Sequence, residues 1–458
     1  MFPSNPSSPS PRHKPRTLGS GFRPIPGLAL ASVLTPVLAL FALGLGLAPA
    51  HAQRDELPPS AAEGHLTPLA PIPDWTLLEP YQLTLTRQEF TDRLTHLYAT
   101  DAASAATFNR YASIDDDEAV FYADENRMVA RFHLHFAPSA DDKRPLPPIL
   151  PPLDTDPAHP LANLTVCLDP GHIGGDWAKM EERFFQVGND DPILEARLTL
   201  LACHRAAPLL EAAGAKVVWA KEDETPVTPL RPDDLRAAAL KAFFEAGLTP
   251  TQFPPALLEE KLRVESEKLF YRTAEIEARA DRIAQLKPDL TLCVHFNAAA
   301  WGDPGDPKFI PQSRIVVFVH GQYMPDELLY EDERYDLLRK LLSQTAPTEL
   351  ALAEKISESL EDEWHLPPEK YTDWPAVKKT GVHPYIYARN LLANRIYPGP
   401  VVFVEGPYMN ADDAYPRLEA GDYDGERLIA GKMVRSIFAE YGEAIANGVV
   451  AYAKQAKN

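Results

Sequence analysis

The sequence predicts an α/β protein whose mostly parallel sheet is sandwiched by helices and preceded by a small α+β domain. From about residue 161 to residue 458, short apolar runs alternate with longer amphipathic stretches, which is the pattern of strands and crossover helices. These runs are continuously apolar, as is typical of strands covered on both faces. One helical stretch and two alternating strands between proline-rich segments predict the smaller domain.

Composition excludes several classes of protein. The 458 residues include 46 prolines, about twice the usual share, but 45% hydrophobic and 24% charged residues are ordinary for a globular chain. Collagen-like and wholly disordered chains are therefore excluded. The net charge of −20 argues against a nucleic-acid or anionic-membrane binder. Three cysteines cannot all pair with one another, so a small disulfide-stapled scaffold is excluded as well.

The first 52 residues have the features of a secretory signal peptide. A basic, acid-free start leads into a 23-residue apolar run at 27–49, and small residues at 50 and 52 suit cleavage. We therefore expect 1–52 to be removed and the mature protein to be periplasmic or extracellular, without a stable membrane span. The alternative is a retained N-terminal membrane anchor facing the periplasm, because 23 apolar residues can cross a bilayer. Cleavage removes four basic and no acidic residues, which changes the net charge to −24.

Proline clusters divide the mature chain. Residues 53–74 are a predicted flexible linker, and 141–160, with seven prolines, are a predicted stiff linker. Between them, 75–140 form the small α+β domain, whose role the sequence does not indicate. Its predicted elements are a threonine-capped helix at 86–99 and strands at 118–123 and 128–137.

The last region, 161–458, is predicted to be one α/β domain. A helix at 192–214 follows Asp190-Asp191-Pro192, which is typical of a cap with proline at the first helical position. The predicted strands are 164–170, 216–221, 289–296, 314–320 and 400–406. A final helix is expected at 425–450, and helical insertions are expected near 231–286 and 325–394.

Several predicted strands end at a reactive side chain, and sites in open α/β sheets form beyond the carboxyl ends of strands. These side chains are His172, His295, Glu405 and His320, and Glu195 lies in the first turn of the first helix. Two imidazoles and a carboxylate are a ligand set for zinc that leaves one position for water. A second carboxylate can move the proton. The pattern predicts a hydrolytic zinc site, with ordinary polar rim residues as the alternative.

Four local strings carry a resemblance to a known family. They are CLDPGHIGGD at 167–176, the helix that begins near Glu195, LCVHFNA at 292–298 and VFVEGPYMN at 402–410. In this order they resemble the signature regions of the zinc-dependent N-acetylmuramoyl-L-alanine amidases, the family-3 type peptidoglycan amidases. The resemblance covers about 163–450 and implies an α/β sandwich around a mixed sheet.

The resemblance implies roles for four residues. His172, Glu195 and His295 look like ligands of a zinc ion (Zn2+), and Glu405 looks like the catalytic carboxylate. The implied reaction cleaves the amide between N-acetylmuramic acid and L-alanine of the stem peptide. Zinc-activated water attacks, and the glutamate passes the proton to the leaving amine.

Three further residues are candidates for supporting roles. Asp169 and Asn297 lie inside the motifs and are candidate partners of the ligands. Arg389 is a candidate to meet a substrate carboxylate. Ala196 stands where the family often has lysine, and the last motif lacks the family's more usual apolar turn. These departures bear on substrate preference and leave the predicted ligands and acid/base in place.

We therefore expect a cell-wall hydrolase that acts on peptidoglycan. An activator protein is a further candidate partner, and no nucleic acid is expected. The alternatives are another zinc-dependent peptidoglycan peptidase and a non-catalytic wall-binding protein. The N-terminal third has no counterpart in the resemblance.

Overall fold

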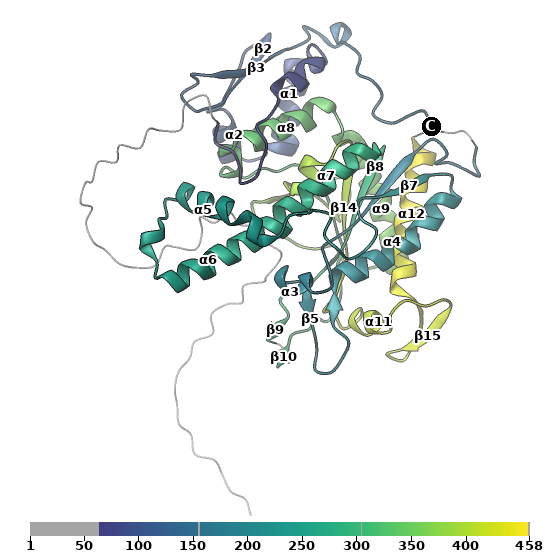
Figure 1. Cartoon of the computed structure of the whole chain (residues 1–458). Coiled ribbons are helices and arrows are strands. Elements are labelled where there is room, and N and C mark those ends of the chain that lie inside the picture. The colour runs from purple at the N-terminus through teal and green to yellow at the C-terminus, as the bar shows by residue number, and fades with distance from the viewer. Residues whose placement is uncertain (1–63, 154–155, 304, 457–458) are drawn as a thin grey trace, which may run out of the picture.

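The computed structural model describes residues 64–153, 156–303 and 305–456 (Figure 1). The predicted signal peptide at 1–52 and the first part of the predicted linker lie outside the described residues. Within the described ranges, no helix has the length and apolar character needed to cross a membrane.

A seven-stranded mixed sheet forms the centre of the larger unit. Its strands are β4 (Thr165–Pro170), β7 (Lys216–Trp219), β8 (Leu290–Asn297), β11 (Val316–His320), β12 (Val377–Lys379), β13 (Ile386–Arg389) and β14 (Val401–Tyr408). They lie in the order β12-β13-β11-β14-β8-β4-β7. Four of the six pairs are parallel, and β11 with β14 and β12 with β13 are antiparallel. The predicted mixed, mostly parallel α/β fold is therefore confirmed.

Helices cover both faces of this sheet (Figure 1). One face packs against α4 (Glu195–Ala212), α9 (Ala346–Trp364) and α12 (Ile437–Gln455). The other face packs against α7 (Glu275–Leu286) and α10 (Leu392–Ile396). Because side chains alternate between faces along a strand, both faces must be apolar. This explains the continuous apolar runs in the sequence.

The small N-terminal unit contains a three-stranded antiparallel sheet and short helices. Its elements are η2 (Trp75–Tyr81), α1 (Arg87–Arg93), η3 (Leu94–Tyr98), α2 (Ala102–Phe108), β1 (Ala112–Ile114), β2 (Glu118–Tyr122) and β3 (Ala130–His135). The predicted threonine cap is confirmed, because the Thr86 hydroxyl accepts a hydrogen bond from the Glu89 amide. The π-helical turn η3 continues α1.

This unit packs directly on the larger one. Its apolar side chains form a single buried cluster with α8 (Glu331–Ser343), a helix of the second predicted insertion. Trp75 also donates a hydrogen bond of 2.9 Å from Nε1 to Glu331. The two units therefore share part of their core.

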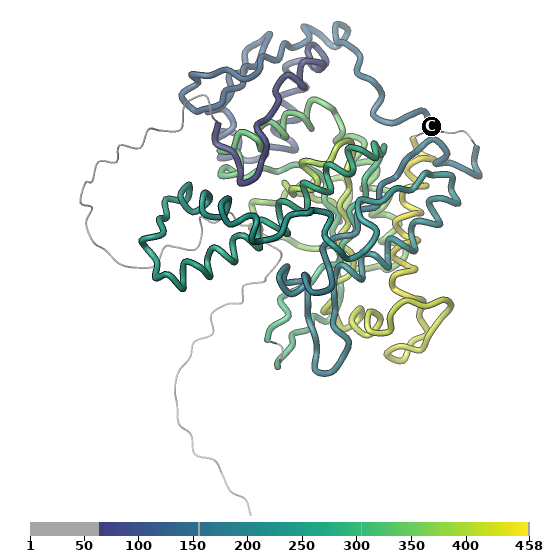
Figure 2. The backbone as a smooth tube through the Cα atoms, viewed as in Figure 1, coloured from purple at the N-terminus to yellow at the C-terminus, as the bar shows by residue number. Residues whose placement is uncertain are grey.

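The first predicted insertion is helical, as expected. Its first helix is α5 (Arg236–Glu245). After a loop, α6 (Pro255–Lys268), the π-helical turn η7 (Leu269–Ala274) and α7 follow one another without a break. In the tube view, α5 and α6 extend away from the sheet, whereas α7 returns across it (Figure 2).

The second predicted insertion, 325–394, differs from the expectation of a helical excursion. It contains α8 and α9, but it also supplies β12, β13 and α10, so it is part of the central sheet. Strands of three and four residues are too short to leave a clear periodicity in the sequence.

The predicted C-terminal helix at 425–450 is wrong in its first part. Residues 426–435 form a hairpin of β15 (Glu426–Ile429) and β16 (Lys432–Arg435). Its two turn residues, Ala430 and Gly431, have φ of 47° and 80°, as a two-residue hairpin turn requires. The helix α12 then begins at Ile437 behind the cap Ser436.

The first helix also begins later than predicted. Ile193 and Leu194 form the strand β6, which pairs with β5 (Phe184–Phe185), so α4 starts at Glu195. The remaining short elements are η4 (Ala140–Asp142), α3 (Trp177–Met180), η5 (Pro232–Leu235), η6 (Pro250–Gln252), β9 (Gly302–Asp303), β10 (Asp306–Pro307), η8 (Glu327–Leu329) and α11 (Tyr415–Glu419).

Candidate metal centre

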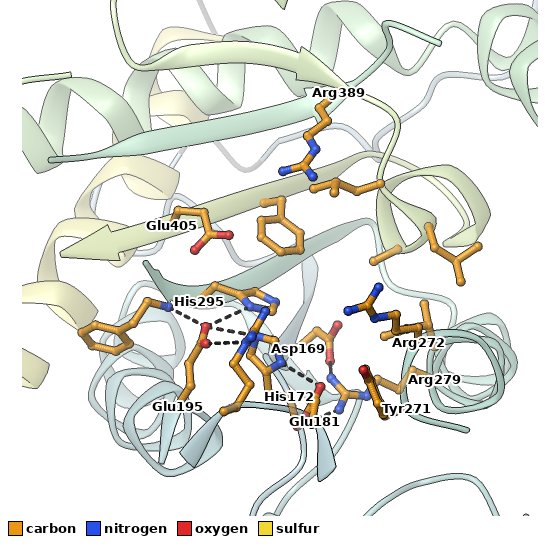
Figure 3. Close-up of a pocket in the computed structure, with 17 residues that line it drawn as sticks. Asp169, His172, Glu181, Glu195, Tyr271, Arg272, Arg279, His295, Arg389 and Glu405 are labelled. Carbon is orange, nitrogen blue, oxygen red and sulfur yellow. Dashed lines mark hydrogen bonds and ion pairs between the residues drawn. The ribbon is translucent and has the colours of Figure 1, made fainter. Parts of the chain in front are cut away.

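Three of the predicted site residues converge where β4 and β8 end. His172 follows β4, His295 lies near the end of β8, and Glu195 is the first residue of α4. One donor atom from each side chain lies within 4.8 Å of the others. Glu195 Oε1 is 3.1 Å from His172 Nε2 and 3.4 Å from His295 Nδ1 (Figure 3). The three side chains surround a common point.

The glycine that precedes His172 makes this approach possible. A Cβ at Gly171 would overlap the ring of His295, so only glycine lets the two predicted ligands lie this close. His172 itself has φ of 63°, a conformation that non-glycine residues rarely adopt. The Thr199 hydroxyl of α4 donates a hydrogen bond of 3.0 Å to the Gly171 carbonyl and ties the loop to the helix.

A carboxylate that the sequence analysis missed orients His172. Glu181 Oε1 lies 2.8 Å from His172 Nδ1, and Glu181 Oε2 accepts a hydrogen bond of 2.8 Å from the Ile173 amide. Metal-ligating histidines usually bond a carboxylate through their second ring nitrogen. The sequence signal was the pair Glu181-Glu182 after the glycine loop, but it does not show which carboxylate turns inward.

Asp169, a predicted partner of the ligands, is bonded instead to Tyr397 and to a second missed residue, Arg279 of α7. Asp169 accepts hydrogen bonds from Arg279 at 3.0 Å and from Tyr397 at 2.9 Å. Arg279 also donates to the carbonyls of Pro170 and His172, at 3.0 and 2.8 Å. The buried arginine therefore holds the loop that presents His172.

Glu405, the predicted acid/base, lies opposite His295 in the register of β14 and β8. Figure 3 shows its carboxylate pointing into the pocket, and within the described residues it has no hydrogen-bond or ion-pair partner. Burial, together with the negative charge of Glu195, raises the pKa of Glu405 to about 8. The next residue, Gly406, lies under the Tyr441 ring, which a Cβ would approach to 2.6 Å.

The two predicted histidine ligands have different proton affinities. Burial lowers the pKa of His172, but the charges of Glu195 and Glu181 outweigh it and raise the value to about 9. Burial and the charge of His172 lower the pKa of His295 to about 4. Burial opposes ionisation of Glu195, yet its bonds to the two histidines hold its pKa below the usual value.

Arg389 and Asn297 have different positions relative to the pocket. Arg389 is buried and lines it, with its guanidinium carbon 4.7 Å from the Trp374 ring centroid. Asn297 is not among the lining residues, and its Oδ1 accepts a hydrogen bond of 2.8 Å from the next amide, that of Ala298.

His320 ends a strand but does not reach this site. Its strand β11 runs antiparallel to β14, so its carboxyl end lies at the opposite edge of the sheet. The ring is fully buried, with Nε2 3.1 Å from the Tyr323 hydroxyl, and burial lowers its pKa.

These residues fit a zinc ion. Two imidazoles and one carboxylate are a common zinc ligand set, and the geometry is supported by Glu181 on one ligand and by the Phe296 amide, 3.2 Å from Glu195 Oε1. The adjoining cavity has a volume of about 150 Å³.

No protein-family model matches the chain, and no curated protein matches it. Solved structures do match, each over 64% of this chain. Ami1 of Mycobacterium abscessus is 15% identical with a TM-score of 0.36 and 99% of its chain covered. AmiC2 of Nostoc punctiforme is 16% identical, with a TM-score of 0.34 and 97% of its chain covered. The catalytic domain of CwlV from Bacillus (Paenibacillus) polymyxa is 12% identical, with a TM-score of 0.33 and 98% of its chain covered. These three are N-acetylmuramoyl-L-alanine amidases. At such identities, a function for this chain must come from its own side chains.

Proposed function

We propose that this protein is an exported, zinc-dependent N-acetylmuramoyl-L-alanine amidase that cleaves the amide between N-acetylmuramic acid and L-alanine in peptidoglycan. The observation that carries the proposal is the convergence of His172, Glu195 and His295 within 4.8 Å, beside the Glu405 carboxylate, which has no partner among the residues that the structure describes. The resemblance of the four local strings supports the substrate.

His172, Glu195 and His295 would hold the zinc ion. A bound zinc ion supplies a Lewis acid that polarises a carbonyl group and acidifies water. Glu181 keeps Nδ1 of His172 occupied, so that Nε2 faces the site. Arg279 and Asp169 fix the loop, and Asn297 shapes the turn after β8.

Glu405 is the proposed acid/base. It takes a proton from the attacking water, whose oxygen forms a bond to the lactyl carbonyl carbon. It then gives that proton to the nitrogen of L-alanine as the carbon–nitrogen bond breaks. A carboxylate without a protein partner is suited to this exchange. Arg389, which reaches the same pocket, is the proposed contact for a substrate carboxylate.

Export is part of the proposal. The basic start, the apolar run and the small residues before position 53 support a cleaved signal and a periplasmic or extracellular enzyme. Because peptidoglycan is itself largely anionic and the mature chain would carry −24, binding by net charge is not expected. Recognition would come from the pocket, or from an activator protein that delivers the enzyme.

Digestion of purified sacculi tests the function. The mature chain is incubated with sacculi, with zinc present or with zinc removed by a chelator, and the new ends are identified by mass spectrometry. We expect free lactyl ends and intact stem peptides, lost on chelation and restored by zinc. Shortened peptides would instead indicate a stem-peptide peptidase. Full activity in metal-free protein would contradict the zinc site.

A further inference from the structure

We propose that Arg272 binds the free α-carboxylate of the second residue of the stem peptide and thereby selects substrates that carry this charge. The inference rests on the proposed amidase function and defines its substrate class more narrowly. Arg272 belongs to the π-helical turn η7 and was not among the residues that the sequence analysis selected.

Four arginines line the pocket, and the ion pairs of Arg183 and Arg279 distinguish them from Arg272. Arg183 Nε lies 3.2 Å from Glu195 Oε2, and Arg279 is paired with Asp169 and Glu275. Arg272 differs, because it has no ion pair with any carboxylate in the part of the chain that the structure describes. Its guanidinium is therefore available to a substrate anion.

Aromatic rings contact the guanidinium groups of both Arg272 and Arg389. The guanidinium carbon of Arg272 lies 5.4 Å from the Tyr271 ring centroid. That of Arg389 lies 5.4 Å from Phe318, in addition to its contact with Trp374. A guanidinium that lies over a ring keeps its in-plane N–H donors, and no carboxylate of the described residues is ion-paired with those of Arg272. Figure 3 shows the two side chains reaching the pocket from a helix and from a strand end.

The position of Arg272 along the helix suits a group beyond the first residue of the peptide. Arg272 precedes Arg279 by seven residues, about 10 Å of helix, and Arg279 is bonded to the His172 carbonyl. An extended peptide advances about 3.3–3.6 Å per residue. Two residues therefore span most of the roughly 10 Å, and the length of the arginine side chain covers the remaining distance. The π-helical turn also changes which side of the helix Arg272 faces relative to α7.

The neighbouring cavity restricts an anion to this position. It shares Arg272 and Leu392 with the pocket, but beyond them carboxylates, among them Asp281 and Asp332, outnumber the two further arginines, Arg339 and Arg395. A carboxylate that moved past Arg272 would meet like charges. A neutral first residue followed by an anionic second residue therefore matches the pocket. In a stem peptide with L-alanine followed by a γ-linked glutamate, that anion is the α-carboxylate, and its amidation removes the charge.

Two synthetic substrates test this inference. Both are N-acetylmuramoyl-L-alanyl peptides in which the γ-carboxyl group of the second residue is blocked as an amide; in one this residue is D-glutamate with a free α-carboxylate, and in the other it is the α-amide, D-isoglutamine. The zinc-loaded mature protein should cleave the carboxylate substrate with a kcat/KM higher by roughly 10- to 100-fold, as expected for a charge-assisted hydrogen bond. Arg272→Gln should bring this ratio close to one, and Arg272→Lys should give an intermediate ratio.

Arg263→Gln is the matched control. Arg263 lies on α6 of the same continuous helix, is paired with Glu260 and Glu267, and does not line the pocket, so the variant should keep the wild-type ratio. Equal kcat/KM values for the two substrates in wild type would overturn the inference while leaving the amidase function intact. A ratio that Arg272→Gln does not change would overturn it as well. If wild type releases peptide from neither substrate, nor from sacculi, the proposed function fails and this inference fails with it.

Discussion

Arg279 Nη2 donates a hydrogen bond of 2.8 Å to the backbone carbonyl of His172, although the two residues lie 107 positions apart in the chain. The arginine side chain is only 1% exposed and is paired on its other sides with Asp169 and Glu275. Glu275 in turn accepts hydrogen bonds from the amides of Val227 and Thr228. A buried network on α7 thus supports the loop that carries the first predicted zinc ligand.

Replacing this arginine should destabilise the protein. Arg279→Met leaves two buried carboxylates without their cation, which costs about 3–5 kcal/mol in unfolding free energy. Urea unfolding of the metal-free protein measures the change. Arg282→Met is the control, because Arg282 forms an exposed pair with Glu222 and should lose at most about 1 kcal/mol. Equal losses in the two variants would show that the buried network does not support the fold.

Glu181→Gln should weaken zinc binding without unfolding the protein. The carboxylate that orients His172 loses its charge, and such partners of metal ligands usually contribute about 10- to 100-fold in affinity. Competition with a chromophoric chelator measures the zinc affinity. The neighbouring Glu182 is exposed, so Glu182→Gln should bind zinc as wild type does. If both variants bind equally well, Glu181 is not needed to position the ligand.

Gly171→Ala should abolish zinc binding by moving His295. The added methyl group would occupy the space of the imidazole ring, and a strand-borne side chain in a packed sheet has little room to retreat. Gly305→Ala introduces the same group where nothing lies within 4 Å. We expect less than stoichiometric zinc in the first variant by elemental analysis and one zinc per chain in the second. Stoichiometric zinc in Gly171→Ala would contradict the geometry of the site.

Glu405→Gln should keep zinc and lose turnover. The amide is nearly the same size but cannot carry the proton between water and the leaving nitrogen, and this step is worth about 10²- to 10⁴-fold. Peptide release from sacculi and elemental zinc analysis are measured on the same preparation. Wild-type release would exclude Glu405 as the acid/base, and loss of zinc would instead assign it to metal binding.

The sequence allowed the central site to be predicted because strand ends can be recognised from the pattern. An apolar run that stops at a polar side chain identified His295 and Glu405. Because β8 and β14 pair in parallel, the carboxyl ends of both strands lie at the same edge of the sheet. The same pattern at His320 does not indicate a ligand, because the direction of a strand depends on long-range pairing. Strand β11 runs the other way, which no local signal shows.

The residues that the sequence analysis missed lie in charged stretches. Arg272 and Arg279 stand among glutamates and other arginines in a helix that the pattern presents as solvated. Whether a charged side chain turns inward depends on a carboxylate far away in the chain, as Asp169 does for Arg279. The hairpin at 426–435 was missed for a different reason. Its apolar spacing also fits a helix, and its turn has alanine where asparagine or aspartate would have been a clear signal.

The shared core predicts that the small N-terminal unit is needed for the stability of the larger one. Trp75, Phe90 and Phe132 from the small unit and Tyr335 and Leu338 from α8 belong to one buried cluster. A chain that starts at residue 144 would expose the α8 side of this cluster to water, at a cost of about 25 cal/mol for each Å² of apolar surface. We expect it to melt well below a chain that starts at residue 64 and to bind a hydrophobic dye. Calorimetry of both chains provides the comparison, and identical melting temperatures would show that the small unit is an accessory to an independently stable α/β domain.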